Sequence, residues 1–176
     1  YTERKKNLRV KKLQTIIFLK TDQKMTLAQA KKTAPAFDTN NVAIAVAAND
    51  YFIPYCATFL KSMAEHRDSD KNYDILLLSQ DVSDINVKNV KKMLSAWKNI
   101  SLRVLDPSVL IDQYTFHIEG HFSKETYYRL VLPELLPNYD KVLYLDSDMI
   151  AMDDVAKIYD ENIDGYLLAA CHDADT

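Results

Sequence analysis

The amino-acid sequence predicts an α/β fold, in which helices cover both faces of a mainly parallel sheet to form a Rossmann-like three-layer α/β/α sandwich. Short apolar runs of strand length alternate with segments of helical periodicity. The first run, VAIAVA at residues 42–47, is continuously apolar, as expected for a strand covered on both faces. With 176 residues, the chain is long enough for one domain with a sizeable core.

The first half of this alternation is predicted as follows. A helix over residues 53–66 follows the first strand, and DILLL at 74–78 forms a second buried strand. A second helix is expected over residues 83–97. Its apolar positions predict a buried face made of Ile85, Val90, Met93, Leu94 and Trp97.

The second half continues with a third strand at residues 100–105. Ser123 can cap a helix that runs to about Pro133, and residues 141–145 and 166–170 form a fourth and a fifth strand. In sheets of this kind, ligands bind in the crevice beyond the carboxyl ends of the strands. Functional residues are therefore expected just after each apolar run.

Residues 1–38 are predicted to be a basic helical segment or linker ahead of a domain at 39–176. Residues 1–35 carry a formal charge of +8, which leaves −11 on the remainder of the chain. Val10, Leu13 and Ile17, with Ile16 beside them, fall at helical spacing among lysines and arginines. The segment either packs on this domain or an upstream one, or residues 1–34 rest peripherally on an anionic membrane surface. Nucleic acid is not an expected partner, because the main domain is acidic and the segment lacks interleaved aromatics.

Composition excludes several classes of protein. Gly120 and Gly165 are the only glycines, so neither a G-x-G-x-x-G motif nor a Walker loop can be written. The two cysteines, Cys56 and Cys171, make a disulfide scaffold improbable and indicate a reducing, cytoplasmic compartment. No apolar run reaches transmembrane length. Because the chain begins at Tyr1 rather than Met, we expect it to be a piece of a longer protein.

The strongest candidate site is the segment KVLYLDSDMI, in which Asp146 and Asp148 follow directly after an apolar strand. Two carboxylates placed so close together repel one another, and a hard divalent cation relieves that repulsion. Carboxylate oxygens and bridging phosphates suit Mg²⁺ or Mn²⁺, which would neutralise a diphosphate leaving group. The alternative is a solvated acidic turn, which is common after strands.

A second candidate site lies at the end of the first predicted strand, in AANDYFIPY at residues 47–55. The small side chains of Ala47 and Ala48 would let a ligand approach the backbone closely, and Asn49 or Asp50 could hydrogen-bond the edge of a base. An aromatic side chain could stack on that base. Taken alone, Asn49 and Asp50 are better interpreted as a turn and a helix cap. The same holds for the aromatics, which taken alone are better interpreted as core or surface residues: Tyr51, Phe52 and Tyr55.

A third candidate is HFSKETYYR at residues 121–129. The guanidinium of Arg129, on a helix just before the acidic segment, could hold phosphate or the acidic turn itself. An ion pair with a neighbouring carboxylate is an equal alternative. His121 on its own would be an ordinary loop histidine.

Together these segments resemble the retaining glycosyltransferases of family 8, a GT-A-fold group that includes glycogenin and bacterial lipooligosaccharide galactosyltransferases. The resemblance spans residues 41–176, the N-terminal nucleotide-binding part, and is carried in order by VAIAVAANDYFIPY, HFSKETYYRLVLPELLP, YDKVLYLDSDMIAMDD and YLLAACHDAD. It implies a metal-dependent hexosyltransferase that moves glucose or galactose from a UDP-sugar to a glycan, lipid-linked or protein acceptor with retention of configuration. Synthesis of a bacterial surface glycan is an implied setting.

The resemblance also implies roles for individual residues. Asp146 and Asp148 would be the ligands of Mn²⁺ or Mg²⁺. Phe52 stands where the family usually stacks a tyrosine on uracil, and Asn49 stands where an aspartate is frequent. No catalytic nucleophile is implied. The implied donor-binding residues are Ala47, Ala48, Asn49, Phe52, His121, Arg129, Asp146, Ser147 and Asp173.

One departure from the family pattern favours alternatives without turnover. The family continues with a second half that supplies a histidine metal ligand and much of the acceptor site, and His172 lies too soon after the acidic segment to be that ligand. Inactivity of this chain alone is therefore one expected outcome. A non-catalytic nucleotide-sugar-binding or accessory domain is the alternative function. An aspartate-nucleophile phosphohydrolase, with Asp146 as nucleophile, is disfavoured because Ile150 replaces the required Thr or Val.

Overall fold

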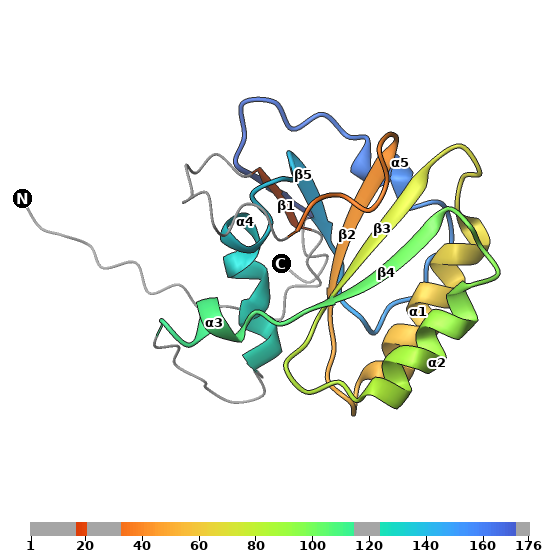
Figure 1. The fold of residues 1–176 in the computed structure, drawn as a ribbon. Coiled ribbons are helices and arrows are strands. Elements are labelled where there is room, and N and C mark those ends of the chain that lie inside the picture. The colour runs from red at the N-terminus through yellow and green to blue at the C-terminus, as the bar shows by residue number, and fades with distance from the viewer. Residues whose placement is uncertain (1–16, 21–32, 115–123, 172–176) are drawn as a thin grey trace, which may run out of the picture.

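The computed structural model describes residues 17–20, 33–114 and 124–171. These residues form one sheet with helices on both of its faces (Figure 1). The strands are β1 (Ile17–Lys20), β2 (Asn41–Ala47), β3 (Asn72–Leu78), β4 (Ile100–Leu105), β5 (Lys141–Tyr144) and β6 (Leu168–Ala170). The helices are α1 (Ile53–His66), α2 (Asp84–Leu94), α3 (Ser108–Ile111), the 3₁₀ helix η1 (Lys124–Val131), α4 (Leu132–Leu135) and α5 (Ala156–Tyr159).

The sheet has the strand order β4-β3-β2-β5-β1-β6. Strands β4, β3, β2 and β5 run parallel to one another, whereas β1 runs antiparallel to both β5 and β6. The predicted α/β fold with a mainly parallel sheet is therefore confirmed. The chain first adds strands on one side of β2, as β3 and β4, and then returns to the other side as β5. This reversal places a topological switch point between β2 and β5.

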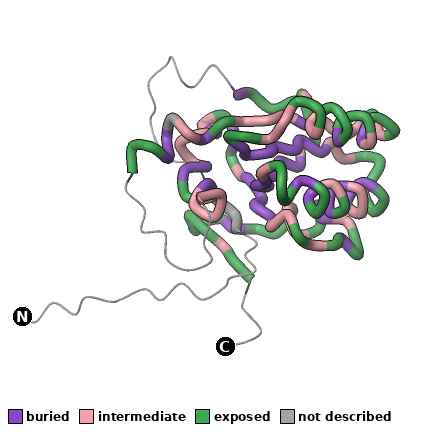
Figure 2. Tube along the Cα trace, turned by 90° about the horizontal axis from the view of Figure 1, so that it is seen from below, coloured by how far each residue is buried: buried purple, intermediate pink, exposed green. Residues whose placement is uncertain are grey.

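The packing of strand β2 on both of its faces explains why its sequence is continuously apolar. Val42, Ile44 and Val46 pack with α1 and α2 on one face of the sheet, in a cluster that includes Phe59, Leu60, Val90 and Leu94. The alternate residues face the other side and pack with η1 and α4, in a second cluster: Ala43, Ala45 and Ala47. The buried segments run through the middle of the molecule (Figure 2). Because both faces of β2 are covered, the predicted three layers are confirmed.

The two long helices lie close to their predicted positions. Helix α1 begins beside Pro54, which is tolerated in a first helical turn, and buries a face that includes Cys56, Phe59 and Met63. Helix α2 buries Val90 and Leu94, while Met93 and Trp97 are partly buried against the same cluster. The prediction that Ile85 is buried is wrong. Its side chain is 62% exposed, because it lies in the first turn, away from the face that contacts the sheet and α1.

Strand β1 corrects the prediction of a basic helix at the N-terminus. Residues Ile17–Lys20 form a strand that pairs with β5, from Ile17 opposite Tyr144 to Lys20 opposite Lys141. The run IIFLK is rich in β-branched and aromatic residues, and β5 offers an unpaired edge, so sheet pairing overrides the helical spacing. The remainder of the predicted helix and the capping residue Ser123 lie outside the described residues. The helix predicted up to about Pro133 is a 3₁₀ helix as far as Val131.

The amino ends of the strands are tied together by the fully buried carboxylate of Asp74 in β3. Arg103 of β4 binds it through Nη2 at 2.6 Å and Nε at 3.2 Å. The phenol of Tyr139 donates to it at 2.7 Å, and the backbone N–H of Ala36 donates at 2.9 Å. Arg103 also donates to the carbonyl of Ala34 at 2.7 Å. Residues ahead of β2, in β3, in β4 and just before β5 are thus joined by one buried charge.

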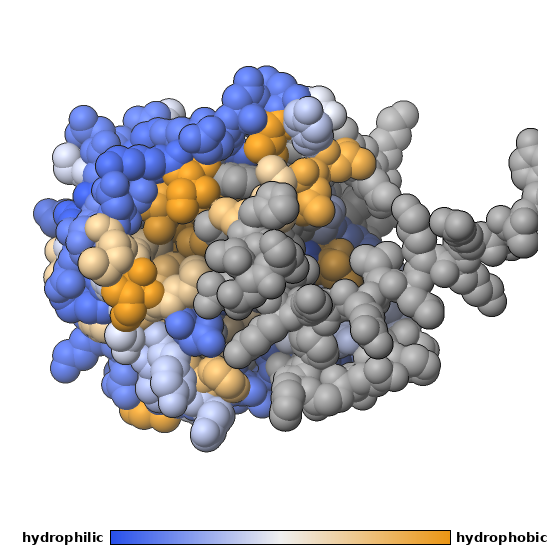
Figure 3. Space-filling view, turned by 180° about the vertical axis from the view of Figure 1, so that it is seen from behind, coloured by the Kyte–Doolittle hydropathy of each residue, from blue (hydrophilic) through white to orange (hydrophobic). Residues whose placement is uncertain are grey.

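On the face opposite to that of Figure 1, apolar side chains gather in patches among hydrophilic ones (Figure 3). Tyr166, Leu167 and Leu168 are consecutive exposed apolar residues at β6. Within the described ranges, no helix combines the length and apolar character needed to span a bilayer. Both cysteines are free thiols, Cys56 buried in α1 and Cys171 exposed; burial raises the pKa of Cys56 to about 12.

The Asp74 network predicts a large loss of stability when its central carboxylate is removed. Asp74→Ala leaves Arg103 without its partner and should lower the free energy of unfolding by roughly 3 kcal/mol or more, measured by urea denaturation. Asp153→Ala, which removes an exposed ion pair with Lys157, should leave the free energy of unfolding close to that of the wild type. Equal losses in the two variants would contradict the structural role given to Asp74.

Candidate functional site

The candidate site lies at the carboxyl ends of β2 and β5, on the two sides of the switch point. The pairing of these strands extends past β5, where Leu145 N donates to Ala45 O at 3.0 Å. Asn49 therefore leaves β2 on one side of the crevice and Asp146 leaves β5 on the other. Such a crevice is where parallel sheets of this kind bind ligands.

The acidic turn that follows β5, residues 146–148, is fixed by contacts on both sides. Asp146 and Ser147 are half-buried and Asp148 is exposed. Met149 packs against the core cluster, and Ala151 N donates to Ser62 Oγ of α1 at 2.9 Å. The turn is therefore fixed by the strand before it and by α1 after it, and its carboxylates are left accessible.

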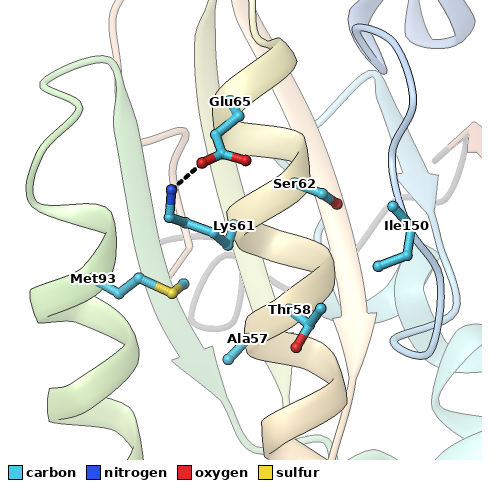
Figure 4. A pocket seen from close by; sticks show the side chains of 7 residues that line it. All are labelled: Ala57, Thr58, Lys61, Ser62, Glu65, Met93 and Ile150. Carbon is cyan, nitrogen blue, oxygen red and sulfur yellow. Dashed lines mark hydrogen bonds and ion pairs between the residues drawn. The ribbon is translucent and has the colours of Figure 1, made fainter.

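A hollow of about 350 Å³ lies beside this turn, between α1, α2 and Ile150 (Figure 4). Ser62 and Ile150 face it from opposite sides, and Lys61 pairs with Glu65 along its wall. None of the predicted donor-binding residues lines it. The hollow is therefore a neighbour of the candidate site and not the site itself.

The carboxylates of Asp146 and Asp148 fit a divalent cation as part of its ligand set. They are oxygen donors two residues apart on one turn, and Mg²⁺ is commonly bound by one or two carboxylates together with substrate phosphates and water. Among the described residues, no group of three or more His, Cys, Asp or Glu side chains could hold a metal. A cation here would need further ligands from its substrate, from water or from residues outside the described ranges.

Arg129 reaches the acidic turn from η1. Its Nη2 lies 3.4 Å from Asp146 Oδ1, its Nε donates to Thr126 O at 2.8 Å, and its guanidinium lies 4.6 Å from the ring centre of Tyr144. Burial raises the pKa of Tyr144 to about 12, so the ring under the guanidinium stays neutral at physiological pH. Arg129 thus forms an ion pair with Asp146 of the acidic turn, and its guanidinium places a positive charge at the entrance of the crevice. That Arg129 binds phosphate stays a prediction.

Both the oxygen and the nitrogen of the Asn49 side-chain amide form hydrogen bonds within the protein. Its Oδ1 accepts from the backbone N–H groups of Tyr51 and Phe52, each at 3.0 Å, and its Nδ2 donates to Glu125 Oε1 of η1 at 3.0 Å. The predicted turn at this position is therefore present, whereas the N-cap of α1 is Phe52, which makes no side-chain cap hydrogen bond. The bond to Glu125 also joins the end of β2 to η1 across the top of the sheet.

Asp50 does not face the crevice as a base-binding residue would. Its Oδ1 accepts from Ser83 N at 2.7 Å, from Ser83 Oγ at 3.1 Å and from Asn86 Nδ2 at 2.9 Å. Asp50 thus caps the start of α2. The hydrogen bond from the Ser83 backbone, followed by that from Asn86, holds the pKa of Asp50 below its ordinary value.

The aromatic residues after Asn49 lie at the surface. Tyr51 and Tyr55 are exposed, and Phe52 between them is 40% exposed. The ring of Phe52 makes an edge contact with Tyr51 at 5.4 Å and a tilted contact with Tyr55 at 5.9 Å. An exposed face of Phe52 is compatible with stacking on a planar ligand. The prediction that these aromatics belong to the core is excluded.

The predicted site residues fall into two groups. Asn49, Phe52, Arg129 and the acidic turn lie around the carboxyl ends of β2 and β5, as do the buried small residues Ala47 and Ala48. His121 and Asp173 lie outside the described residues. Sequence reasoning missed Glu125 and Ser62, because each acts through a contact with a residue that is remote in sequence.

The comparisons with known proteins identify the family of the chain. The model of the family "Glycosyl transferase family 8" matches residues 43–176, which includes the acidic turn and both flanking segments. The chain therefore belongs to glycosyltransferase family 8. The resemblance inferred from the sequence, and with it the glycosyltransferase class and the GT-A fold, is confirmed.

Curated relatives match over a similar range. General stress protein A of Bacillus subtilis is 22% identical over 130 residues, which cover 72% of this chain and 44% of that protein. Glycosyltransferase GlyF of Streptococcus pneumoniae is 29% identical over 133 residues, covering 74% of this chain and 31% of that protein. The chain thus spans less than half the length of these relatives.

Solved structures extend the likeness to three dimensions. The bifunctional glycosyltransferase WbbM in its apo form superposes with a TM-score of 0.65 and 33% identity, covering 74% of this chain and 22% of WbbM. The galactosyltransferase LgtC, solved with donor and acceptor sugar analogues, superposes with a TM-score of 0.54 and 28% identity, covering 68% of this chain and 42% of LgtC.

The capping role of Asp50 predicts a specific dependence of stability on pH. Because its pKa is lowered in the folded protein, ionised Asp50 stabilises the fold above its ordinary pKa of 3.8, and that contribution is lost as the pH falls through the folded value. Asp50→Asn keeps an oxygen acceptor without the charge. Its melting temperature should lie below that of the wild type at about pH 6 and converge with it at about pH 2. A constant gap would contradict this role, and Asp140→Asn controls for net charge.

Proposed function

We propose that this domain binds a UDP-hexose, with glucose or galactose as the sugar, and contributes to transfer of the hexosyl group to a hydroxyl acceptor with retention of configuration. In that reaction, the bond between the anomeric carbon and the diphosphate oxygen breaks. A bond to the acceptor oxygen forms on the same face, the acceptor hydroxyl loses its proton, and UDP leaves. The acceptor is a glycan, a lipid-linked sugar or a protein, and a bacterial surface glycan is the proposed product.

The observation that carries the proposal is the convergence of Asn49, Phe52, Arg129 and the acidic turn on the switch point of a sheet in a family 8 chain. An exposed aromatic face suits a base, and the guanidinium of Arg129 suits a diphosphate oxygen. Ala47 and Ala48, being small, let a nucleoside approach the end of β2. LgtC, a galactosyltransferase that was solved with donor and acceptor sugar analogues, supports the same class of ligand.

Asp146 and Asp148 would hold the cation, which we propose to be Mn²⁺ or Mg²⁺. When bound, it would neutralise negative charge on the diphosphate as UDP leaves. Arg129 is placed to hold the side chain of Asp146 before the ligand arrives and to contribute positive charge to the same region afterwards. The guanidinium of Arg129 packs on the ring of Tyr144, and this contact holds the guanidinium in its orientation.

A second candidate function is nucleotide-sugar binding without transfer. It needs only the residues at the carboxyl ends of β2 and β5, and the chain spans less than half the length of these curated relatives. The two functions share the donor site. They differ in whether the hexose is transferred to an acceptor or only held.

The donor site predicts that UDP and a divalent cation stabilise the protein together. At about one hundred times its dissociation constant, UDP with Mn²⁺ should raise the unfolding free energy by roughly 2.7 kcal/mol, measured as a shift in melting temperature. Asp148→Asn should abolish the shift. Asp140→Asn, at the amino end of the same strand, should retain it.

The outcomes separate the alternatives. A shift by UDP that is independent of metal and of Asp148 would contradict the proposed cation site, and no shift at all would contradict donor binding by this domain. Where the shift is present, release of free UDP from UDP-glucose or UDP-galactose in the presence of acceptor sugars distinguishes transfer from binding alone.

A further inference from the structure

We propose that Glu125 is a positioning residue that sets which base the donor site accepts, by fixing the side-chain amide of Asn49. The inference rests on the proposed function, because it concerns the base of the nucleotide donor. Glu125 lies in the first turn of η1, and its partner Asn49 lies 76 residues earlier, at the end of β2. The contact therefore joins η1 to the β2 side of the crevice.

The orientation of the Asn49 amide follows from its partners. Backbone N–H groups can only donate, so the group that accepts from Tyr51 and Phe52 must be the Asn49 oxygen. The nitrogen is then directed to Glu125 Oε1 at 3.0 Å, and a carboxylate that accepts a hydrogen bond suits that nitrogen. The amide oxygen is thus paired with hydrogen-bond donors, and the amide nitrogen with an acceptor. A flipped amide would lose all three hydrogen bonds.

This orientation has a consequence for ligands. The Asn49 nitrogen carries two hydrogens, and one is used by Glu125. Within the described part of the chain, no second acceptor is recorded for it, so the other N–H can donate to a base. Uracil presents a carbonyl oxygen at position 4, which accepts such a bond, whereas cytosine presents an amino group there, which cannot. An N–H that meets position 4 of the base therefore favours uracil over cytosine.

Glu125 also carries a charge near a site for an anionic diphosphate, and this must be separated from its effect on the base. Removing the charge changes the affinity for UDP and CDP alike, because the two nucleotides carry the same diphosphate. The ratio of the two affinities therefore reports the base contact alone. Glu125→Gln removes the charge and keeps an oxygen that can accept from Asn49, whereas Glu125→Ala removes both.

The test measures dissociation constants for UDP and CDP with Mn²⁺ by titration calorimetry on the whole chain. We expect the wild type to prefer UDP, and Glu125→Ala to lower that preference about three- to tenfold, which is the scale of one hydrogen bond. Glu125→Gln should keep most of the preference. Glu134→Ala, which removes a half-buried glutamate from α4, should leave it unchanged.

The failures are distinguishable. If the wild type binds UDP and Glu125→Ala keeps the full preference, the role of Glu125 is overturned and the donor site stands. If the wild type binds neither nucleotide, the donor site is overturned and this inference with it.

A measurement without nucleotide tests the contact itself. In NMR spectra, the side-chain amide protons of Asn49 should shift as the Glu125 carboxyl titrates, and should not do so in Glu125→Gln. If the chemical shifts of the Asn49 amide protons do not change during this titration in the wild type, the proposal is also overturned.

Discussion

The fold depends most on one buried carboxylate, that of Asp74. It accepts hydrogen bonds from a guanidinium of β4, from a phenol in the segment before β5 and from a backbone N–H in the segment before β2. A charge with no exposure is tolerated only because all of these partners are in place together. The network therefore fixes the amino ends of the central strands relative to one another. The site lies at their opposite ends, where accessible polar groups do not have to be buried to hold the sheet together.

The switch point explains why residues so far apart in sequence meet. Strands β2 and β5 are neighbours in the sheet, although some 90 residues separate them in the chain. Asn49 and Asp146 follow these strands and therefore lie at one edge of the sheet. From η1, Glu125 contacts Asn49 and Arg129 contacts Asp146. The 3₁₀ helix thus contacts both sides of the crevice through two charges of opposite sign.

Much of this arrangement could be predicted from local patterns, and the rest could not. The continuous apolar run of β2 indicated a strand covered on both faces, and the acidic turn was found because it follows directly after such a run. The strand at Ile17–Lys20 was missed because its stability comes from pairing with β5, which no periodicity within the segment reveals. The bonds of Asp74 to Arg103 and of Asn49 to Glu125 depend on strand register and on the placement of η1, so no local signal announces them.

The charges around the crevice support the proposal of a divalent cation on electrostatic grounds. Among the described residues that converge there, Asp146, Asp148 and Glu125 are acidic and Arg129 is basic, for a formal charge of −2 at neutral pH. Arg129 is already shared with Asp146, so it cannot offset a diphosphate on its own. An anionic ligand would therefore meet net repulsion in this half-buried crevice, where charges are screened less than in bulk water. A cation held by Asp146 and Asp148 would neutralise the two carboxylates and leave the positive charge of Arg129 available to the diphosphate.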